Sequence, residues 1–146
     1  MSERDAQEMT TWRYDPPYSF YDWEADPNDL ALLLSAEHRE GRYFSAFGED
    51  GELIGFFGFG TAGEDVVLGL GLRPDYTGRG LGLGYLEAGM AFARERFRPS
   101  RFRLSVATFN QRAIRVYERA GFVPLRTYDR ETNGGVHPFL EMARPA

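Results

Sequence analysis

The sequence predicts an α/β domain in which helices flank a mixed β-sheet. Two pairs of apolar segments are each separated by a glycine-containing turn, which indicates two hairpins. A strand, a long helix and a second strand follow one another over residues 66–108. Hairpins are antiparallel, whereas a strand–helix–strand unit places its strands parallel with a right-handed crossover. The sheet is therefore expected to be mixed, in a two-layer or three-layer arrangement.

The composition predicts one packed domain over residues 1–146. Aromatic residues make up 15% of the chain, with 12 Phe and 8 Tyr, which argues for a packed core and against disorder. The net charge is −5, and all 17 basic residues are arginine, without a basic run. Nucleic acid is therefore not an expected partner.

Several kinds of site are excluded by residue types that the sequence lacks. Without cysteine there is no disulfide, thiolate nucleophile or zinc–thiolate site. The two histidines have no ligand-like spacing, so no metal is expected. The N-terminal segment lacks a signal-peptide pattern and no stretch is apolar enough to span a bilayer. The sequence thus predicts a cytoplasmic protein without a membrane partner.

The N-terminal region is expected to hold an arm and a short helix. Residues 11–23, "TWRYDPPYSFYDW", are aromatic and interrupted by two prolines, which favours a short strand or extended arm over a helix. Residues 27–36, "PNDLALLLSA", predict a helix that begins near Pro27 or Asn28.

Each expected hairpin has its turn at a glycine. The first joins strands at 43–48 and 52–60 through Glu49-Asp50-Gly51. The second joins strands at 123–131 and 136–144 through Asn133-Gly134-Gly135.

The central unit contains the longest predicted helix. A strand over 66–74 ends at Pro74, and a helix over 79–97 carries an apolar stripe at helical spacing. The stripe consists of Leu83, Leu86, Met90, Ala93 and Phe97. A strand at 101–108 follows. The next helix, "NQRAIRVYERAGF", is expected to be capped by Asn110 and ended by Gly121.

Residues 75–89, "DYTGRGLGLGYLEAG", place five glycines between a strand end and a helix start. Unpaired amides and the positive end of the helix dipole meet there, which favours a phosphate ligand. Gly78, Gly80 and Gly82 would let a diphosphate approach the backbone, and Arg79 adds a positive charge. The alternative is a tight turn with close helix–sheet packing.

Two common phosphate-binding motifs do not fit this stretch. A Walker A loop needs a lysine, which the chain lacks. The dinucleotide pattern G-x-G-x-x-G fails in all three registers, because Leu83, Tyr85 or Glu87 stands at its last position.

The segment "LRPDYTGRGLGLGYLEAGMAFA" resembles the acetyl-CoA loop of the GNAT superfamily of N-acetyltransferases, with the signature Q/R-x-x-G-x-G/A. In one register Thr77 takes the first position and Gly80 and Gly82 are the signature glycines. In the other, Arg79, Gly82 and Gly84 match the letters. We prefer the first, in which Thr77 replaces the usual Gln or Arg.

A second segment resembles the same family. In "NQRAIRVYERAGF" the pattern N-x-x-A-x-x-x-Y-x-x-x-G-F is met by Asn110, Ala113, Tyr117, Gly121 and Phe122. The two segments occur in the family's order with a strand between them, so together they are more specific than either alone.

The resemblance implies a mostly antiparallel sheet with a central, splayed parallel strand pair and acetyl-CoA as cosubstrate. The pantetheine arm would lie between these strands and bond to the backbone of Leu70 and Leu72. Gly69 and Gly71 fit such an approach, or alternatively pack under an aromatic ring. The cofactor contacts implied in this way are Leu70, Leu72, Gly78, Arg79, Gly80, Leu81, Gly82, Leu83 and Asn110.

By the same resemblance Tyr117 is the expected general acid. A tyrosine is protonated at neutral pH and can donate a proton to a departing thiolate. Asn110 would contact the cofactor as well as cap its helix, or only cap it. The general base is open: Ser105 stands where ribosomal-protein acetyltransferases have a Glu, and Glu64 and Asp65 are possible bases through water.

The acceptor is expected to be a primary amine of a small molecule, peptide or protein. In this fold the N-terminal region builds the acceptor cleft, so Tyr14 and Tyr18 are candidate substrate contacts, although most aromatic residues of the arm would cover the core. A non-catalytic acyl-CoA sensor is the alternative function. The chain is expected to be a monomer or homodimer.

Overall fold

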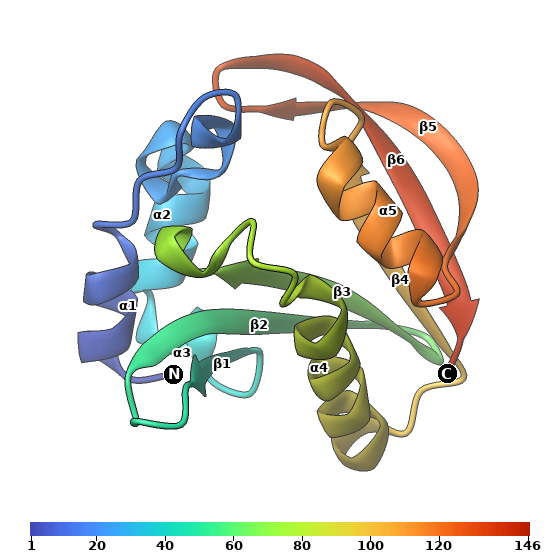
Figure 1. Cartoon of the computed structure of the whole chain (residues 1–146), viewed down its shortest axis with the longest axis horizontal. Helices are drawn as coiled ribbons and strands as arrows, with labels where there is room; N and C mark the ends of the chain where they lie inside the picture. The colour runs from blue at the N-terminus through green and yellow to red at the C-terminus, as the bar shows by residue number, and fades with distance from the viewer.

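A six-stranded sheet in the order β1-β2-β3-β4-β6-β5 forms the centre of the protein (Figure 1). The structure is a computed structural model that describes all 146 residues. The strands are β1 (Tyr43–Phe47), β2 (Leu53–Ala62), β3 (Asp65–Leu72), β4 (Arg101–Ala107), β5 (Val123–Thr132) and β6 (Gly135–Pro145). The helices are α1 (Glu3–Met9), α2 (Pro27–Leu34), α3 (Ala36–Arg39), α4 (Gly82–Phe97) and α5 (Gln111–Arg119), with 3₁₀ turns η1 (Tyr18–Tyr21), η2 (Trp23–Ala25) and η3 (Pro74–Tyr76).

Only β3 and β4 pair in parallel, and they pair over a short length. Their register runs from Asp65 opposite Arg101 to Val67 opposite Arg103, and then the strands separate. All other neighbouring strands are antiparallel. The prediction of a mixed, mostly antiparallel sheet with one parallel pair is confirmed.

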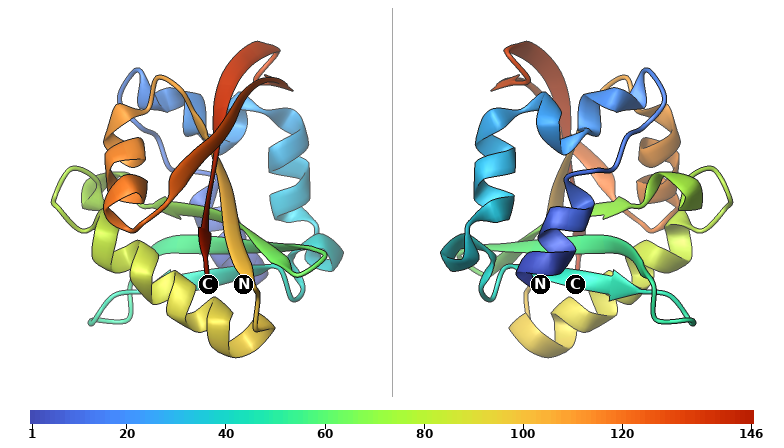
Figure 2. Two further views of the ribbon diagram at one scale, coloured as in Figure 1. Left: turned by 90° about the vertical axis from the view of Figure 1, so that its right-hand side faces the viewer. Right: turned by 90° about the vertical axis from the view of Figure 1, so that its left-hand side faces the viewer.

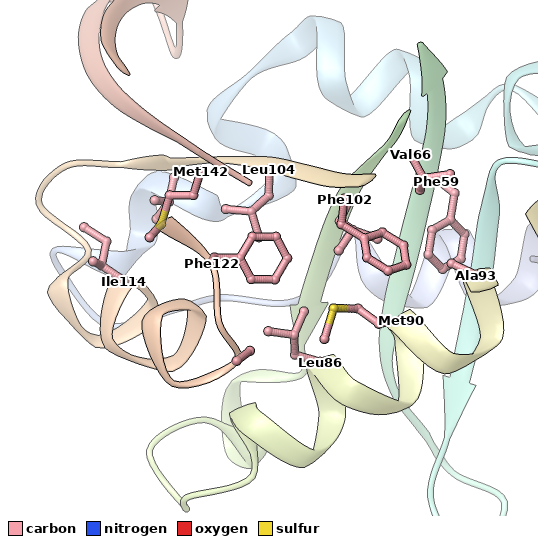
Figure 3. Packing of buried hydrophobic residues seen from close by; sticks show 13 residues of the cluster. Phe59, Val66, Leu86, Met90, Ala93, Phe102, Leu104, Ile114, Phe122 and Met142 are labelled. Atoms are coloured by element: carbon pink, nitrogen blue, oxygen red, sulfur yellow. The ribbon is translucent and has the colours of Figure 1, made fainter. Parts of the chain in front are cut away.

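The helices cover the sheet on two sides. Figure 2 shows α4 and α5 on one side and α2 and α3 on the other. The larger core lies under α4, where Leu86, Met90 and Ala93 face Phe102 of β4 (Figure 3). A smaller core joins α1 and α2 to β2; it consists of Ala6, Met9, Trp12, Leu33 and Leu53. The predicted apolar stripe is thus the face of α4 that packs on the sheet.

Two parts of the N-terminal region differ from the sequence prediction. No element was predicted for residues 3–9, which form α1. This helix is stabilised because Ala6 and Met9 bury their side chains against α2 and β2. The arm over 11–23 is not a strand. It contains η1 and η2, which form after the cis peptide bond between Pro16 and Pro17.

Element ends shift by a few residues where backbone geometry decides them. The long helix begins at Gly82 instead of 79, because Gly78 and Gly80 have φ values of +71° and +74°. The preceding strand ends at Leu72, since Pro74 starts a 3₁₀ turn. No helix has the length and hydropathy needed to cross a membrane.

Candidate active site

A cavity of about 460 Å³ lies where β3 and β4 separate. One end is lined by the glycine loop and the start of α5, and the other by η2, α2 and the tip of the β5–β6 hairpin. We call these the cofactor end and the acceptor end. Tyr117 lines the cavity, as do Leu70 and Leu72.

The gap between β3 and β4 leaves backbone groups of β3 unpaired. The backbone amide of Arg73 donates to the carbonyl of Ile54 in β2. Because peptide groups alternate in direction along an extended strand, the backbone groups of Gly71 and Gly69 also face β2. The backbone groups of Leu70 and Leu72 then face the gap, beyond the last β3–β4 pair, where the Leu72 carbonyl accepts a hydrogen bond from Tyr14. An added strand-like ligand needs backbone groups that face a gap in this way.

The two strand glycines have different surroundings. A Cβ at Gly71 would lie 2.5 Å from Cε1 of Phe56, so this glycine makes room for an aromatic ring. A Cβ at Gly69 would have only the carbonyl oxygen of Gly58 nearby, at 3.9 Å. Aromatic packing therefore explains Gly71 but not Gly69.

The glycine loop presents free amides to the cofactor end. Gly78 and Gly80 have positive φ, and a Cβ at Gly80 would meet nothing within 4 Å, so conformation and not crowding requires these glycines. Helix α4 starts without a side-chain cap, and the first amide with an intrahelical partner is that of Tyr85. Gly82 has a different role, because a Cβ there would lie 3.2 Å from Val116 of α5.

Several side chains of this loop lie elsewhere than the sequence predicted. Arg79 does not line the cavity: its guanidinium lies 5.3 Å from the ring centre of Tyr76 and donates to the carbonyl of Asp75. Leu83 packs on the core instead of lining the cavity, while Leu81 lines it. Thr77 lines the cavity, but its hydroxyl donates to the carbonyl of Pro74.

Arg112 is a site residue that the sequence prediction missed. Its Nη1 lies 3.9 Å from where a Cβ on Gly78 would be, and its guanidinium lies 4.1 Å from the ring centre of Tyr18. It lines the cavity and has no salt bridge. Its place in the first turn of the capped helix, two residues after Asn110, could have indicated this position.

Tyr117 and Asn110 both line the α5 wall of the cavity. The side-chain oxygen of Asn110 accepts from the amide of Ala113 at 3.1 Å, which confirms the predicted cap. Its Nδ2 donates to the hydroxyl oxygen of Tyr21 at 3.1 Å. Burial, and secondarily the nearby Tyr21, raise the pKa of Tyr117 well above its ordinary value. Tyr117 therefore stays protonated at neutral pH.

The two carboxylates named as possible bases, Glu64 and Asp65, do not line this cavity. Asp65 pairs with Arg101 and Arg103, at 2.8 and 2.9 Å. Glu64 lies in the turn before β3, beside Ser100. Both stand at the end of β3 where the sheet is closed. Ser105 does line the cavity, and its hydroxyl oxygen accepts from Tyr128 at 2.8 Å.

Tyr14 and Tyr18 both line the cavity, at different places. The Tyr14 hydroxyl donates to the carbonyl of Leu72 at 2.6 Å and so fastens the arm to β3. Tyr18 lies beside Arg112, at the cofactor end. Asp22 and Asp29, which the sequence prediction missed, line the cavity too. No sequence pattern distinguished them from other acidic residues of the arm and its helix.

Comparisons with known proteins agree with this geometry. Residues 5–122 match the model of the acetyltransferase (GNAT) family. The chain is 38% identical over 84 residues to a mycothiol acetyltransferase of Propionibacterium freudenreichii subsp. shermanii. That match covers 54% of this chain and 27% of the relative, so the chain spans about a quarter of that protein's length.

Solved structures of this fold match almost the whole chain. An acetyltransferase (GNAT family) from Bacillus anthracis matches with a TM-score of 0.78 at 15% identity, over 99% of this chain and 91% of that one. Mycobacterium smegmatis RimJ in complex with CoA-disulfide matches with a TM-score of 0.70 at 21% identity, over 100% and 79%. At these identities the likeness shows the fold. The family model, which covers most of the chain, shows more: this protein belongs to the acetyltransferase (GNAT) family.

Proposed function

We propose that the protein transfers the acetyl group of acetyl-CoA to a primary amine, with Tyr117 as the general acid. The observation that carries the proposal is the Tyr117 side chain, which lines the cavity beside the separated strands and has its pKa raised by burial. The membership of an acetyltransferase family supports the same reaction.

Each part of the CoA thioester has a complementary part of the cavity in this proposal. The diphosphate binds the amides around Gly78 and Gly80, with Arg112 supplying a positive charge. The pantetheine bonds to the backbone of Leu70 and to the amide of Leu72, since the Leu72 carbonyl is bonded to Tyr14. The thioester then lies near Tyr117, which lines the same cavity.

The reaction follows from these placements. The neutral amine attacks the thioester carbonyl, the carbon–sulfur bond breaks, and the thiolate takes its proton from the Tyr117 hydroxyl. The nitrogen loses one proton as the amide forms, and this proton restores the Tyr117 hydroxyl through solvent. At pH 7 about one in 2,500 amine groups with a pKa near 10.4 is uncharged. The carboxylates that line the cavity, Asp22 and Asp29, belong to the N-terminal region and not to α5 or β4. We therefore expect the rate to rise with pH as the amine loses its proton.

The test separates CoA binding from turnover. CoA at 100 times its dissociation constant should stabilise the protein by about 2.7 kcal/mol, or roughly 5–10 °C in melting temperature. Thiol release from acetyl-CoA is then followed with a panel of amines. Absence of stabilisation at millimolar CoA would disprove the proposal; stabilisation without turnover of any amine would identify an acyl-CoA sensor.

A further inference from the structure

The acceptor end of the cavity carries two carboxylates that the proposed reaction does not use. Asp22 lies just before η2, and Asp29 lies in the first turn of α2. Both line the cavity, beside Trp23 and Phe56, whose ring centres are 5.3 Å apart. An apolar wall and two acidic groups thus occupy the same end.

The two carboxylates differ in whether they have a partner. Asp22 accepts a hydrogen bond from the amide of Tyr14 at 2.9 Å. Asp29 is half-buried and forms no side-chain hydrogen bond or salt bridge. Burial, and then the neighbouring Asp26, raise the pKa of Asp29, while Arg130 lowers it. A cation bound beside Asp29 would offset this cost of burial.

Arg130 does not supply that cation. It lines the cavity, but it is exposed and forms no salt bridge with Asp29. Its guanidinium lies 5.3 Å from the ring centre of Phe139. Asp29 therefore remains available to a ligand.

The charges in the cavity are separated along its length. Arg112 stands at the cofactor end, beside Gly78, and Asp29 at the acceptor end. Helix α5, which carries Tyr117, and helix α2, which carries Asp29, lie on opposite sides of the molecule in both Figure 1 and Figure 2. The nitrogen that attacks near Tyr117 must be uncharged, so Asp29 faces a different part of the acceptor.

We infer that the acceptor carries a second group that is cationic at neutral pH, besides the amine that is acetylated, and that Asp29 binds this group and selects for it. Trp23 and Phe56 line the path of the connecting carbon chain. The inference rests on the proposed function only in placing the reacting amine near Tyr117. Asp29 is thus a specificity residue and takes no proton in the reaction.

The test is a calorimetric titration of the CoA-saturated protein with alkane diamines of graded length and with amino alcohols of matching length. We expect at least one diamine to bind about tenfold more tightly than its amino alcohol, and Asp29→Asn to remove that difference. CoA affinity and melting temperature should stay unchanged. Equal binding of diamine and amino alcohol, or an unchanged preference in Asp29→Asn, would overturn the inference.

Two further variants separate a local contact from net charge. Glu24→Gln removes a carboxylate of η2 that pairs with Arg13 and does not line the cavity, so it should leave diamine binding unchanged. Arg130→Gln removes a positive charge that lowers the pKa of Asp29 without forming a salt bridge to it, and should tighten binding. A loss in Glu24→Gln equal to that in Asp29→Asn would refute a local role. Diamine binding without acetyl transfer would defeat the proposed function and leave the Asp29 assignment intact.

Discussion

The cofactor end and the acceptor end of the cavity are built in different ways. The cofactor end uses backbone groups from one stretch of chain, β3 and the glycine loop, together with the capped start of α5. The acceptor end uses side chains from the N-terminal arm, held by bonds to distant segments. The side-chain Nδ2 of Asn133 donates to the carbonyl of Phe20 at 2.6 Å, and Asp26 accepts from the Thr132 hydroxyl at 2.7 Å. Local geometry thus shapes the cofactor end, and tertiary contacts shape the acceptor end.

The largest expected effect is on kcat and tests whether Tyr117 of α5 is the proton donor. Tyr117→Phe removes the proton donor and should lower kcat at least about 100-fold, the lower limit for a lost general acid. CoA affinity and melting temperature should change little, because the ring stays. Thiol release under saturating substrates measures the effect; a loss below about threefold would contradict the assignment.

The pH profile sharpens the same point. Because burial raises the pKa of Tyr117, this group stays protonated through the alkaline range. The rate should therefore rise as the acceptor amine deprotonates, without a fall below about pH 10. A fall in rate between pH 8 and about pH 9 would show a different acid.

The next prediction concerns the backbone of the cofactor end. Gly80→Val forces a β-branched residue into positive φ, at a cost of about 1–2 kcal/mol, and fills the space beside the amides. CoA should bind at least about tenfold more weakly by calorimetry. Gly84→Ala is the control, since its φ is not positive and a Cβ there meets nothing within 4 Å. It should keep CoA affinity; equal losses in both variants would argue against an amide cradle.

Asp26 tests whether the acceptor end depends on long-range contacts. It caps α2 through the amides of Asn28 and Asp29, and also accepts from Thr132 and Asn133 of the hairpin tip. Asp26→Ala should lower the free energy of unfolding by about 3 kcal/mol. The KM for the amine should rise while the KM for acetyl-CoA stays nearly constant.

The pH dependence of stability identifies the same carboxylate. Hydrogen bonds from Thr132, and then Asn133, lower the pKa of Asp26 to about 2. The stabilisation is therefore complete above the unfolded pKa of 3.8 and is lost as pH falls from there through about 2. Asp26→Asn should remove this dependence in acid-unfolding experiments. An unchanged acid transition would show that Asp26 does not form these hydrogen bonds.

The smallest effect is expected from the contact between the arm and β3. Tyr14→Phe removes the hydrogen bond to the carbonyl of Leu72 and should lower the free energy of unfolding by about 1 kcal/mol. Tyr18→Phe is the matched control, because Tyr18 contacts Arg112 through its ring and makes no side-chain hydrogen bond. Denaturant unfolding of both variants checks the difference; equal losses would show that the Tyr14 bond does not hold the arm.

The comparison also explains what could be predicted from the sequence. The loop was predictable because positive φ at positions 78 and 80 favours glycine, and α5 was predictable because Asn at position 110 is a preferred helix cap. The place of Asp29 depends on how α2 packs, and no local pattern records that. The same applies to α1, whose helical form depends on the burial of Met9.

The hydrogen bonds between Asp26 and the hairpin tip have a consequence for the order in which parts of the protein fold during synthesis. The partners of Asp26 there, Thr132 and Asn133, lie 106 and 107 positions further along the chain. During translation these bonds cannot form until Thr132 and Asn133 have been synthesised. The glycine loop and α5 precede the hairpin in the chain, so the acceptor end of the cavity is completed after the cofactor end.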